Sequence, residues 1–276
     1  MRLSKILPYL TVLATSAAVY AAPNNQAVQA VLYNKTGAGL VQQQRYAAAV
    51  PYLREAIAFD PTYEPAHRNL CLALLQTGDV DGAIKEGYMA AELGATDPYA
   101  FAYLGQAYMA KGDVAQAVES VEDGVRIAPS NGEIVSMLGV ILDQVGMYKD
   151  AVTQFTYAIR VQPGCVSAHT GLGDVYLHLN RYADAAAEFR HAVKLYKNYP
   201  YAHLELGLSL YKSGHDAEAR AEWIRVLKMS DPNSAQLAKS YLDGVAGNST
   251  VSTVTIKSNG PVSIKSNGQV IIKVKP

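Results

Sequence analysis

The sequence lacks an excess of charge of either sign, because 24 lysines and arginines balance 24 aspartates and glutamates. This balance argues against a nucleic-acid-binding protein that relies on a basic face. Long apolar runs are also missing. The stretch from Ile6 to Ala21 covers about 16 residues, fewer than the roughly 20 that a membrane-spanning helix needs. With half of its residues hydrophobic, the chain can nevertheless build a substantial core, which argues against wholesale disorder.

The N-terminus has the pattern of a secretory signal peptide. Arg2 and Lys5 precede the apolar stretch, and Val19 and Ala21 satisfy the small-residue rule for cleavage before Ala22. We therefore expect a signal peptide over residues 1–21, a linker over 22–29, and an exported protein, periplasmic or secreted, with no membrane span after cleavage. The alternative is an uncleaved signal that anchors the chain in the membrane.

Internal repetition is the strongest pattern in the chain. Six alanines recur every 34 residues without insertion or deletion: Ala49, Ala83, Ala117, Ala151, Ala185 and Ala219. Such a period predicts an all-α solenoid of stacked helical units. The units are 30–63, 64–97, 98–131, 132–165, 166–199 and 200–233. Each is expected to hold two amphipathic helices, as at Glu133–Val145 and Lys149–Val161 in the fourth unit.

Small residues at fixed places explain how the two helices of a unit approach each other. The eighth place holds Gly37, Cys71, Gly105, Gly139, Gly173 and Gly207, and the twentieth holds the six alanines. Larger side chains there would overpack the seam. Between the helices, left-handed turns are expected at Gly78, Gly112, Gly146, Asn180 and Gly214. Units of a solenoid touch only their neighbours, so Cys71 and Cys165 should be buried and unpaired.

These residues resemble the tetratricopeptide repeat family over residues 30–233. The fourth unit matches the family pattern with Leu138–Gly139, Gly146, Tyr148, Ala151, Phe155, Ala158 and Pro163. Three departures are Thr36 for leucine in the first unit, Gly87 for the aromatic in the second, and Lys197 for proline in the fifth. The resemblance implies a scaffold that binds a protein or peptide partner.

The resemblance further implies that the first helices line a concave groove through places 2, 5, 9, 12 and 13 of each unit. The candidate groove residues are Asn34, Gln42, Arg68, Leu72, Gln76, Tyr99, Gln106, Met109, Val140, Asp143, Gln144, Thr170, Asp174, His178, Tyr201, Leu204, Leu208, Tyr211 and Lys212. Glutamine side chains both donate and accept hydrogen bonds, and tyrosine and methionine suit apolar anchors. The alternative is that these positions are merely solvated helix faces.

Patterns that would indicate catalysis or metal binding are missing. His67, His169 and His203 share the fourth place of separate units and are interpreted as core or groove-edge residues rather than ligands of one ion. No histidine pair has zinc-protease spacing, and no serine or cysteine lies in a nucleophile elbow. We therefore predict no enzyme, no catalytic residue, no metal and no cofactor.

The C-terminal part changes character. Residues 234–246 are predicted to be a capping helix with Leu237, Tyr241 and Leu242 on its packed face. The tail, 247–276, repeats Val-x-Ile-Lys-Ser-Asn-Gly, and Asn259–Gly260 and Asn267–Gly268 are two-residue hairpin signals. It is expected to form a basic three-stranded meander; the alternative is a disordered tail.

Two functional hypotheses follow from these patterns. In the first, an adaptor of the cell envelope binds a partner segment in the groove of its first helices. In the second, the tail is the binding element, by strand addition or through an anionic surface polymer, and the solenoid is a spacer. The sequence leaves the partner and the oligomeric state open.

Overall fold

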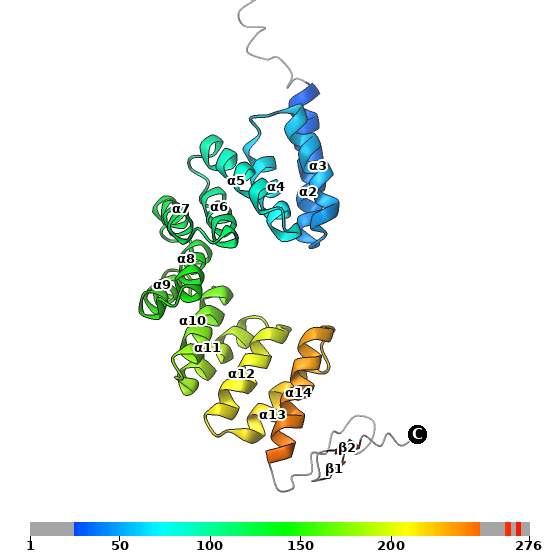
Figure 1. The fold of residues 1–276 in the computed structure, drawn as a ribbon, viewed down its shortest axis with the longest axis vertical. Helices are drawn as coiled ribbons and strands as arrows, with labels where there is room; N and C mark the ends of the chain where they lie inside the picture. The colour runs from blue at the N-terminus through cyan, green and yellow to red at the C-terminus, as the bar shows by residue number, and fades with distance from the viewer. Residues whose placement is uncertain (1–24, 249–262, 266–268, 272–276) are drawn as a thin grey trace, which may run out of the picture. The chain divides into compact units, whose positions relative to one another are not determined.

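A computed structural model of the chain describes residues 25–248, 263–265 and 269–271. The predicted signal peptide, residues 1–21, lies outside these ranges, as does most of the predicted tail. The described residues form thirteen α-helices and two short β-strands (Figure 1). Within these ranges, no helix combines the length and the apolar character needed to cross a bilayer.

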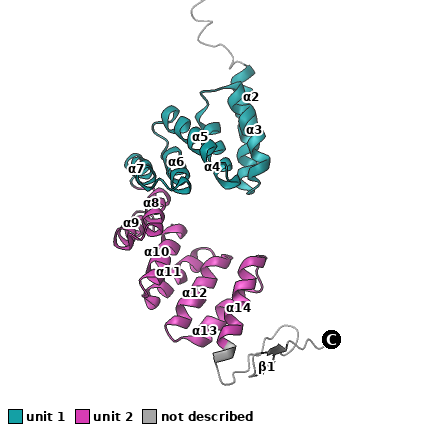
Figure 2. Cartoon of the chain, in the orientation of Figure 1, with its two compact units in different colours: residues 1–129 teal, residues 130–276 magenta. Residues whose placement is uncertain are grey.

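The helices follow one another in pairs, and the chain divides into two compact units (Figure 2). Unit 1, residues 1–129, contains α2 (Asn25–Gln42), α3 (Tyr46–Phe59), α4 (Glu64–Thr77), α5 (Val80–Leu93), α6 (Pro98–Lys111) and α7 (Val114–Ile127). Unit 2, residues 130–276, contains α8 (Gly132–Gln144), α9 (Tyr148–Val161), α10 (Val166–His178), α11 (Tyr182–Leu195), α12 (Pro200–Lys212), α13 (Asp216–Val226) and α14 (Pro232–Asn248). The predicted all-α helical-repeat solenoid is confirmed.

The first helix starts earlier than the repeat period indicates. Helix α2 begins at Asn25, so residues 25–29, predicted as linker, are helical. The sequence from Asn25 to Ala30 contains no proline or glycine that would stop the helix from extending beyond the first repeat.

Left-handed residues connect the two helices of each repeat. Positive φ angles occur at Gly78, Gly112, Gly146, Gly214 and Asn180, as the spacing predicts. Glycine adopts this conformation without the steric cost that a Cβ brings. The first repeat uses Gln44 instead, at a φ of 58°, so a long side chain occupies a strained backbone position there.

Small residues set the distance between paired helices. All six alanines of the twentieth place are fully buried. At the eighth place of the last repeat, a Cβ added to Gly207 would lie 2.3 Å from Nε1 of Trp223. That indole N–H donates to the Leu204 carbonyl over 3.1 Å. The tryptophan therefore packs across the seam because Gly207 has no side chain.

The two cysteines behave as small buried residues. Cys71 and Cys165 are both buried and free, which confirms the prediction that they do not pair. Burial raises the pKa of the Cys71 thiol to about 12. Its thiolate is therefore strongly disfavoured at neutral pH.

Helix α14 packs against α12 and α13 at the end of unit 2. Its contacting face contains the buried Ala238 and Val245 and the partly buried Tyr241, whose ring centroid lies 5.3 Å from that of Trp223. The prediction for Leu237 is wrong, since that side chain is 49% exposed. Ala238, the next residue along α14, faces the core instead. Its small side chain allows α14 to pack close to α12 and α13.

The tail contains the pair β1 (Ser263–Lys265) and β2 (Gln269–Ile271), which are antiparallel. Lys265 pairs with Gln269, so three residues lie between the last paired residue of β1 and the first of β2. The predicted two-residue turn would place only two residues there. The remainder of the predicted meander, including Asn259–Gly260, lies outside the described residues.

Candidate functional site

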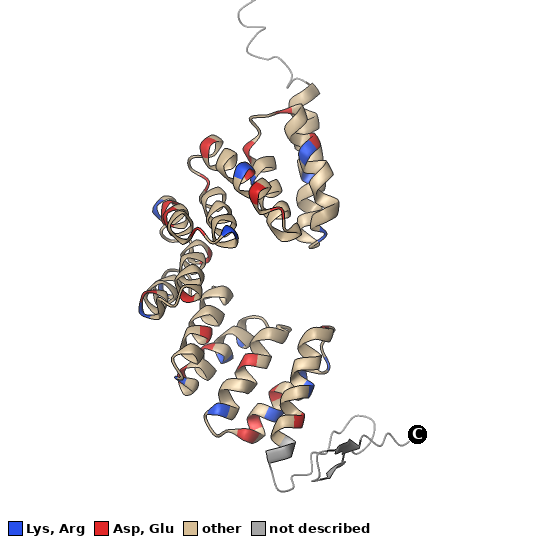
Figure 3. Ribbon diagram, in the orientation of Figure 1, with Lys and Arg blue, Asp and Glu red and all other residues tan. Residues whose placement is uncertain are grey.

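The first helices of neighbouring repeats lie side by side, which brings the candidate groove residues onto adjacent helices. Contacts join α2 to α4 and α4 to α6 in unit 1, and α8 to α10 in unit 2. We call the residues at places 2, 5, 9, 12 and 13 of these helices the first-helix surface, and consider it in each unit separately. Each unit contains both basic and acidic residues along its ribbon (Figure 3).

Most candidate residues are accessible to a partner. The exposed ones are Gln42, Gln76, Val140, Gln144, His178, Tyr201 and Lys212. The partly buried ones are Arg68, Leu72, Tyr99, Gln106, Met109, Asp143, Asp174, Leu208 and Tyr211. A partly buried side chain on a helix is held in place by its neighbours, and this reduces the entropy that binding would otherwise cost.

Three candidates are buried, and their assignment to an open groove is corrected accordingly. Asn34 is 8% exposed and its Oδ1 accepts from the Asn69 amide over 2.9 Å. Thr170 is 6% exposed and donates to carbonyls of its own helix. Leu204 is 2% exposed and packs in the core of unit 2. The resemblance to the tetratricopeptide repeat family implied these positions, but it does not show where the next helix of this chain covers a face.

In unit 1, Arg68 is engaged within the protein. Its guanidinium donates to Asp97, and its Nε lies 3.9 Å from Glu64 Oε1. Asp97 also caps α6 by accepting from the Tyr99 N–H over 3.0 Å. Burial raises the pKa of the Glu64 carboxyl to about 7, against the lowering effect of Arg68. Arg68 therefore joins the start of α4 to the start of α6 and is not a free cation for a ligand.

In unit 2, hydrogen bonds between side chains link three successive first helices. His178 of α10 bonds Asp143 of α8 over 2.8 Å, and the Tyr201 hydroxyl of α12 donates to Asp174 of α10 over 2.6 Å. All four residues belong to the predicted set. These bonds fix the positions of the side chains before any partner arrives.

Two carboxyl groups have raised pKa values here, Asp174 of this surface and Glu205 beside it on α12. Burial raises the pKa of Asp174 to about 6, although the Tyr201 hydroxyl opposes the shift. Burial and the charge of Asp174 raise the pKa of Glu205, at the sixth place of its repeat, to about 7. Glu205 was absent from the predicted set, although an acid on the first helix is visible in the sequence. Burial likewise raises the pKa of Tyr201.

Three repeats contain a buried histidine held between two acceptors, an arrangement that we call the His–Glu brace. The triads of glutamate, histidine and backbone carbonyl are Glu86–His67–Pro61, Glu188–His169–Pro163 and Glu222–His203–Lys197. In each, Nδ1 lies 2.7 Å from the carboxylate, and Nε2 lies 3.0 to 3.2 Å from the carbonyl. The interpretation of these histidines as core residues is confirmed, since each is at most 6% exposed.

In the braces of His67 and His169, the two acceptors favour a protonated imidazole. A carbonyl and a carboxylate can only accept, so both ring nitrogens satisfy them only when both carry hydrogen. Burial alone would lower the pKa of His67, but Glu86 and the Pro61 carbonyl outweigh it and raise the value overall. The hydrogen bond from Glu188 raises the pKa of His169.

The sequence contains a pattern that predicts the brace. Histidine at the fourth place always occurs together with glutamate at the twenty-third place of the same repeat. The three other repeats have neither residue: their pairs are Tyr33 and Tyr52, Phe101 and Ser120, and Val135 and Gln154. Comparing the six repeats column by column would have paired the two places.

Among residues 25–248 and the two strands, no three His, Cys, Asp or Glu side chains are grouped to hold a metal ion. Cys165 instead lies in a polar cluster, 3.3 Å from Glu133 and 3.4 Å from the Ser136 hydroxyl. The prediction that the chain has no catalytic activity stays a prediction.

The described helices place the chain in the class of helical-repeat proteins. Comparison with family models identifies the family within that class. Models described as tetratricopeptide repeat match residues 40–86, 100–131 and 136–202, together more than half of the chain. The chain belongs to the tetratricopeptide repeat family. No curated protein matches it in sequence.

Solved structures share the fold at low sequence identity. A chain of the APC/C hetero-tetramer Cut9–Hcn1 is similar with a TM-score of 0.65 and 20% identity, over 78% of this chain and 43% of that one. PilF of Pseudomonas aeruginosa is similar with a TM-score of 0.62 and 14% identity, over 80% and 100%. A thermophilic repeat protein of Thermus thermophilus has a TM-score of 0.61 and 20% identity, over 66% and 99%. The chain thus spans less than half of the first of these.

Proposed function

We propose that the chain is a non-enzymatic adaptor that binds a segment of a partner protein along the first-helix surface of unit 2. The observation that carries the proposal is the pair of bonds, His178–Asp143 and Tyr201–Asp174, which join three first helices. Proteins of this family generally mediate protein–protein interactions, and a surface fixed in advance binds at a lower entropic cost.

Side chains on this surface offer both apolar and polar contacts. Val140 is 39% exposed, and Leu208 and Tyr211 are partly buried on α12. Aromatic and aliphatic anchors of this kind account for most of the binding energy in protein interfaces. Gln144 and Lys212 are exposed at the C-terminal ends of α8 and α12 and can hydrogen-bond the backbone of a bound segment.

The raised pKa values of Asp174 and Glu205 predict how the binding of a basic segment would depend on pH. A lysine or arginine placed beside Asp174 and Glu205 favours their ionised forms, so binding lowers the pKa of both carboxyls. Because these pKa values are about 6 and about 7 in the free protein, affinity for a basic segment should weaken as the pH falls from 7.5 to 5.5. A partner without a basic residue would show no such dependence.

The proposed location is the cell envelope or the exterior, because the N-terminal pattern is that of an export signal. An uncleaved signal would instead anchor the same adaptor in the membrane. N-terminal sequencing of the purified protein distinguishes the two, since cleavage before Ala22 leaves alanine as the first residue.

The experiment is capture of partners from an envelope fraction, followed by binding assays with variants of the first-helix surface. Val140→Arg and Leu208→Arg place charge on its apolar part. Val114→Arg on α7 is the control, because Val114 is a valine of similar exposure, 38%, on a second helix. We expect the partner to be lost with the first two variants and retained with the control. Retention with both surface variants would refute the proposal.

The second candidate function is binding by the tail, with the solenoid as spacer. The β1–β2 pair favours it, because a two-stranded sheet has open edges that a partner strand can join. The four lysines of the tail also suit an anionic surface polymer. A chain ending at Asn248 separates the candidates: capture that needs the tail supports this function, and high salt weakens only the polymer form of it.

A further inference from the structure

Unit 2 contains a cavity of about 520 Å³, and none of the residues that line it belongs to the candidate groove set. It is formed by the C-terminal end of α11, the turn into α12 and the residues around the end of α13. Four cations line it: Lys194, Lys197, Arg225 and Lys228. A volume of this size is typical of small-ligand sites. No aspartate or glutamate is among the residues that line it.

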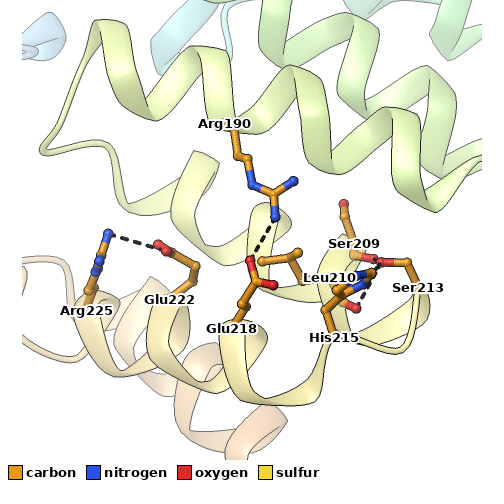
Figure 4. A network of polar contacts seen from close by, with 8 residues as sticks. All are labelled: Arg190, Ser209, Leu210, Ser213, His215, Glu218, Glu222 and Arg225. Carbon is orange, nitrogen blue, oxygen red and sulfur yellow. Dashed lines mark hydrogen bonds and ion pairs between the residues drawn. The ribbon is translucent and has the colours of Figure 1, made fainter.

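The positive charge of this cavity is only partly compensated by the protein. Arg225 forms an ion pair with Glu222 (Figure 4), and its Nη1 lies 3.3 Å from Oε1. Glu222 also bonds His203 of the third His–Glu brace. For the three lysines, no carboxylate in the described part of the chain lies within ion-pair distance. In a chain with no net charge, such a concentration of like charge favours the approach of an anion.

Lys197 shows how the cavity acquires its charge without a change in fold. It occupies the place at which equivalent turns have Pro61 and Pro163, and its carbonyl accepts the same contact from a brace histidine. The preceding residue, Tyr196, has the extended conformation that Asp60 has before Pro61. The backbone thus performs the role of the proline turns, while the side chain lines the cavity.

The repeat period accounts for two of the four cations that line the cavity. Lys194 and Lys228 occupy the same place of successive repeats, 34 residues apart, and stacking brings both to one cavity. Val193 and Met229 add an apolar part to the lining. The site therefore combines several cations with a small apolar patch.

We propose that this cavity binds a phosphate-bearing ligand. Four cations around one small volume match a group that concentrates charge: a phosphate monoester carries nearly two charges and three acceptor oxygens, whereas a carboxylate carries one charge. Val193 and Met229 would contact the organic part of the ligand. The same phosphate chemistry can come from a soluble ligand or from a lipid headgroup, and the experiment separates these sources.

The test is calorimetric titration of the full chain with inorganic pyrophosphate at low salt, with a triple variant, Lys194→Gln, Lys197→Gln and Lys228→Gln. The control variant carries Lys35→Gln, Lys149→Gln and Lys239→Gln, which remove the same charge from exposed positions elsewhere. We expect affinity to fall about tenfold or more in the cavity variant, since each exposed charge contributes modestly, and to change less than twofold in the control. Equal losses in both variants, or no binding by the native chain, would overturn the proposal.

Two further arms define the ligand. Sedimentation with vesicles of phosphatidylcholine containing phosphatidic acid, compared between the cavity and control variants, shows whether the phosphate can be membrane-borne. Cavity-dependent sedimentation supports a lipid source, and pyrophosphate binding without it supports a soluble one. If a hexaglutamate peptide binds as tightly as pyrophosphate and equally needs the three lysines, the site recognises acidic protein segments and the phosphate assignment is wrong.

Lys197→Pro provides a test that does not rely on neutralising several residues. It restores the residue found in equivalent turns and keeps the carbonyl that His203 contacts. We expect an unchanged circular dichroism spectrum and a severalfold weaker affinity for pyrophosphate. Native affinity in this folded variant would show that Lys197 does not contact the ligand and would contradict the proposed site.

Discussion

The Glu188→Gln substitution tests whether the His–Glu brace contributes stability through a protonated histidine. Glu188 Oε2 lies 2.7 Å from Nδ1 of His169, and the other ring nitrogen faces the Pro163 carbonyl. The new amide can donate to an unprotonated Nδ1, so the variant keeps a hydrogen bond but loses the need for an imidazolium. Shape and volume change little, which limits other effects.

The size of the effect follows from burial. Hydrogen bonds to charged groups contribute about 1.5–3 kcal/mol. The Glu188 side chain is 21% exposed and that of His169 8%, so the lower end applies and we expect a loss of about 1.5 kcal/mol. For a chain of this size, about 1 kcal/mol changes Tm by roughly 2–4 °C, which gives roughly 3–6 °C here.

The pH dependence has a defined sign. The pKa of His169 is raised in the folded state, so its contribution is complete below the unfolded value of about 6.5 and disappears as the pH rises through the folded value. The difference between native chain and variant should therefore be largest near pH 6 and shrink by pH 8.5.

The assay is urea unfolding followed by tryptophan fluorescence. Trp223 is the one tryptophan of the chain and lies in the core of unit 2, the unit that also contains His169. Glu218→Gln is the control, because it makes the same chemical change in an exposed ion pair with Arg190 (Figure 4), and exposed pairs contribute little. If Glu188→Gln is as stable as Glu218→Gln at pH 6, or if the difference grows with pH, the brace does not act through a protonated histidine.

Three other substitutions follow from the structure. Gly207→Ala brings a Cβ within 2.3 Å of Trp223, and overpacking should outweigh the gain in helix propensity. We expect the free energy of unfolding in urea to fall by about 1–2 kcal/mol; a stabilised variant would contradict this. Gln44→Gly relieves a positive φ and should stabilise unit 1 by about 1 kcal/mol. Urea unfolding followed by far-UV circular dichroism measures this, because the one tryptophan lies in unit 2; a loss would show that the side chain has a role of its own. Tyr201→Phe removes the hydroxyl that lowers the pKa of Asp174, so that pKa should rise above about 6 in an NMR titration of the carboxyl carbon, and an unchanged value would exclude the hydrogen bond.

The architecture was predictable from the sequence because its determinants repeat. Small residues at the eighth and twentieth places and glycines in the turns recur at the same spacing, so each repeat confirms the next. Features that occur only once in the chain were harder to predict. The exposure of Leu237 depends on packing of the one terminal helix, which no second copy in the chain illustrates. The turn at Gln44 has the 34-residue spacing of the other turns, but glutamine is not a residue at which a positive φ is expected.

Part of the candidate surface was predicted, because the resemblance to the tetratricopeptide repeat family implies which places of the first helices line a groove. Places along the first helices identified Asp143, His178, Asp174 and Tyr201, and the structure bonds them in pairs. The resemblance implies which places line a groove but not what covers them in this chain, so the burial of Asn34, Thr170 and Leu204 was missed. The engagement of Arg68 with Asp97 was missed as well, because it joins a first helix to the last residue of the same repeat, which caps the next first helix.

The His–Glu brace also determines where this chain can be cut and recombined. Each brace begins at a carbonyl that belongs to the preceding repeat and ends at a glutamate in the second helix, as in residues 197–222. A protein engineer who exchanges blocks at the 34-residue boundaries keeps each histidine with its glutamate, because both lie in one repeat. The carbonyl is a backbone group, which Lys197 supplies as well as Pro61 and Pro163 do. Chimaeras joined at the boundaries should therefore retain the brace, whereas those joined between the histidine and the glutamate should lose stability wherever the incoming repeat lacks either residue.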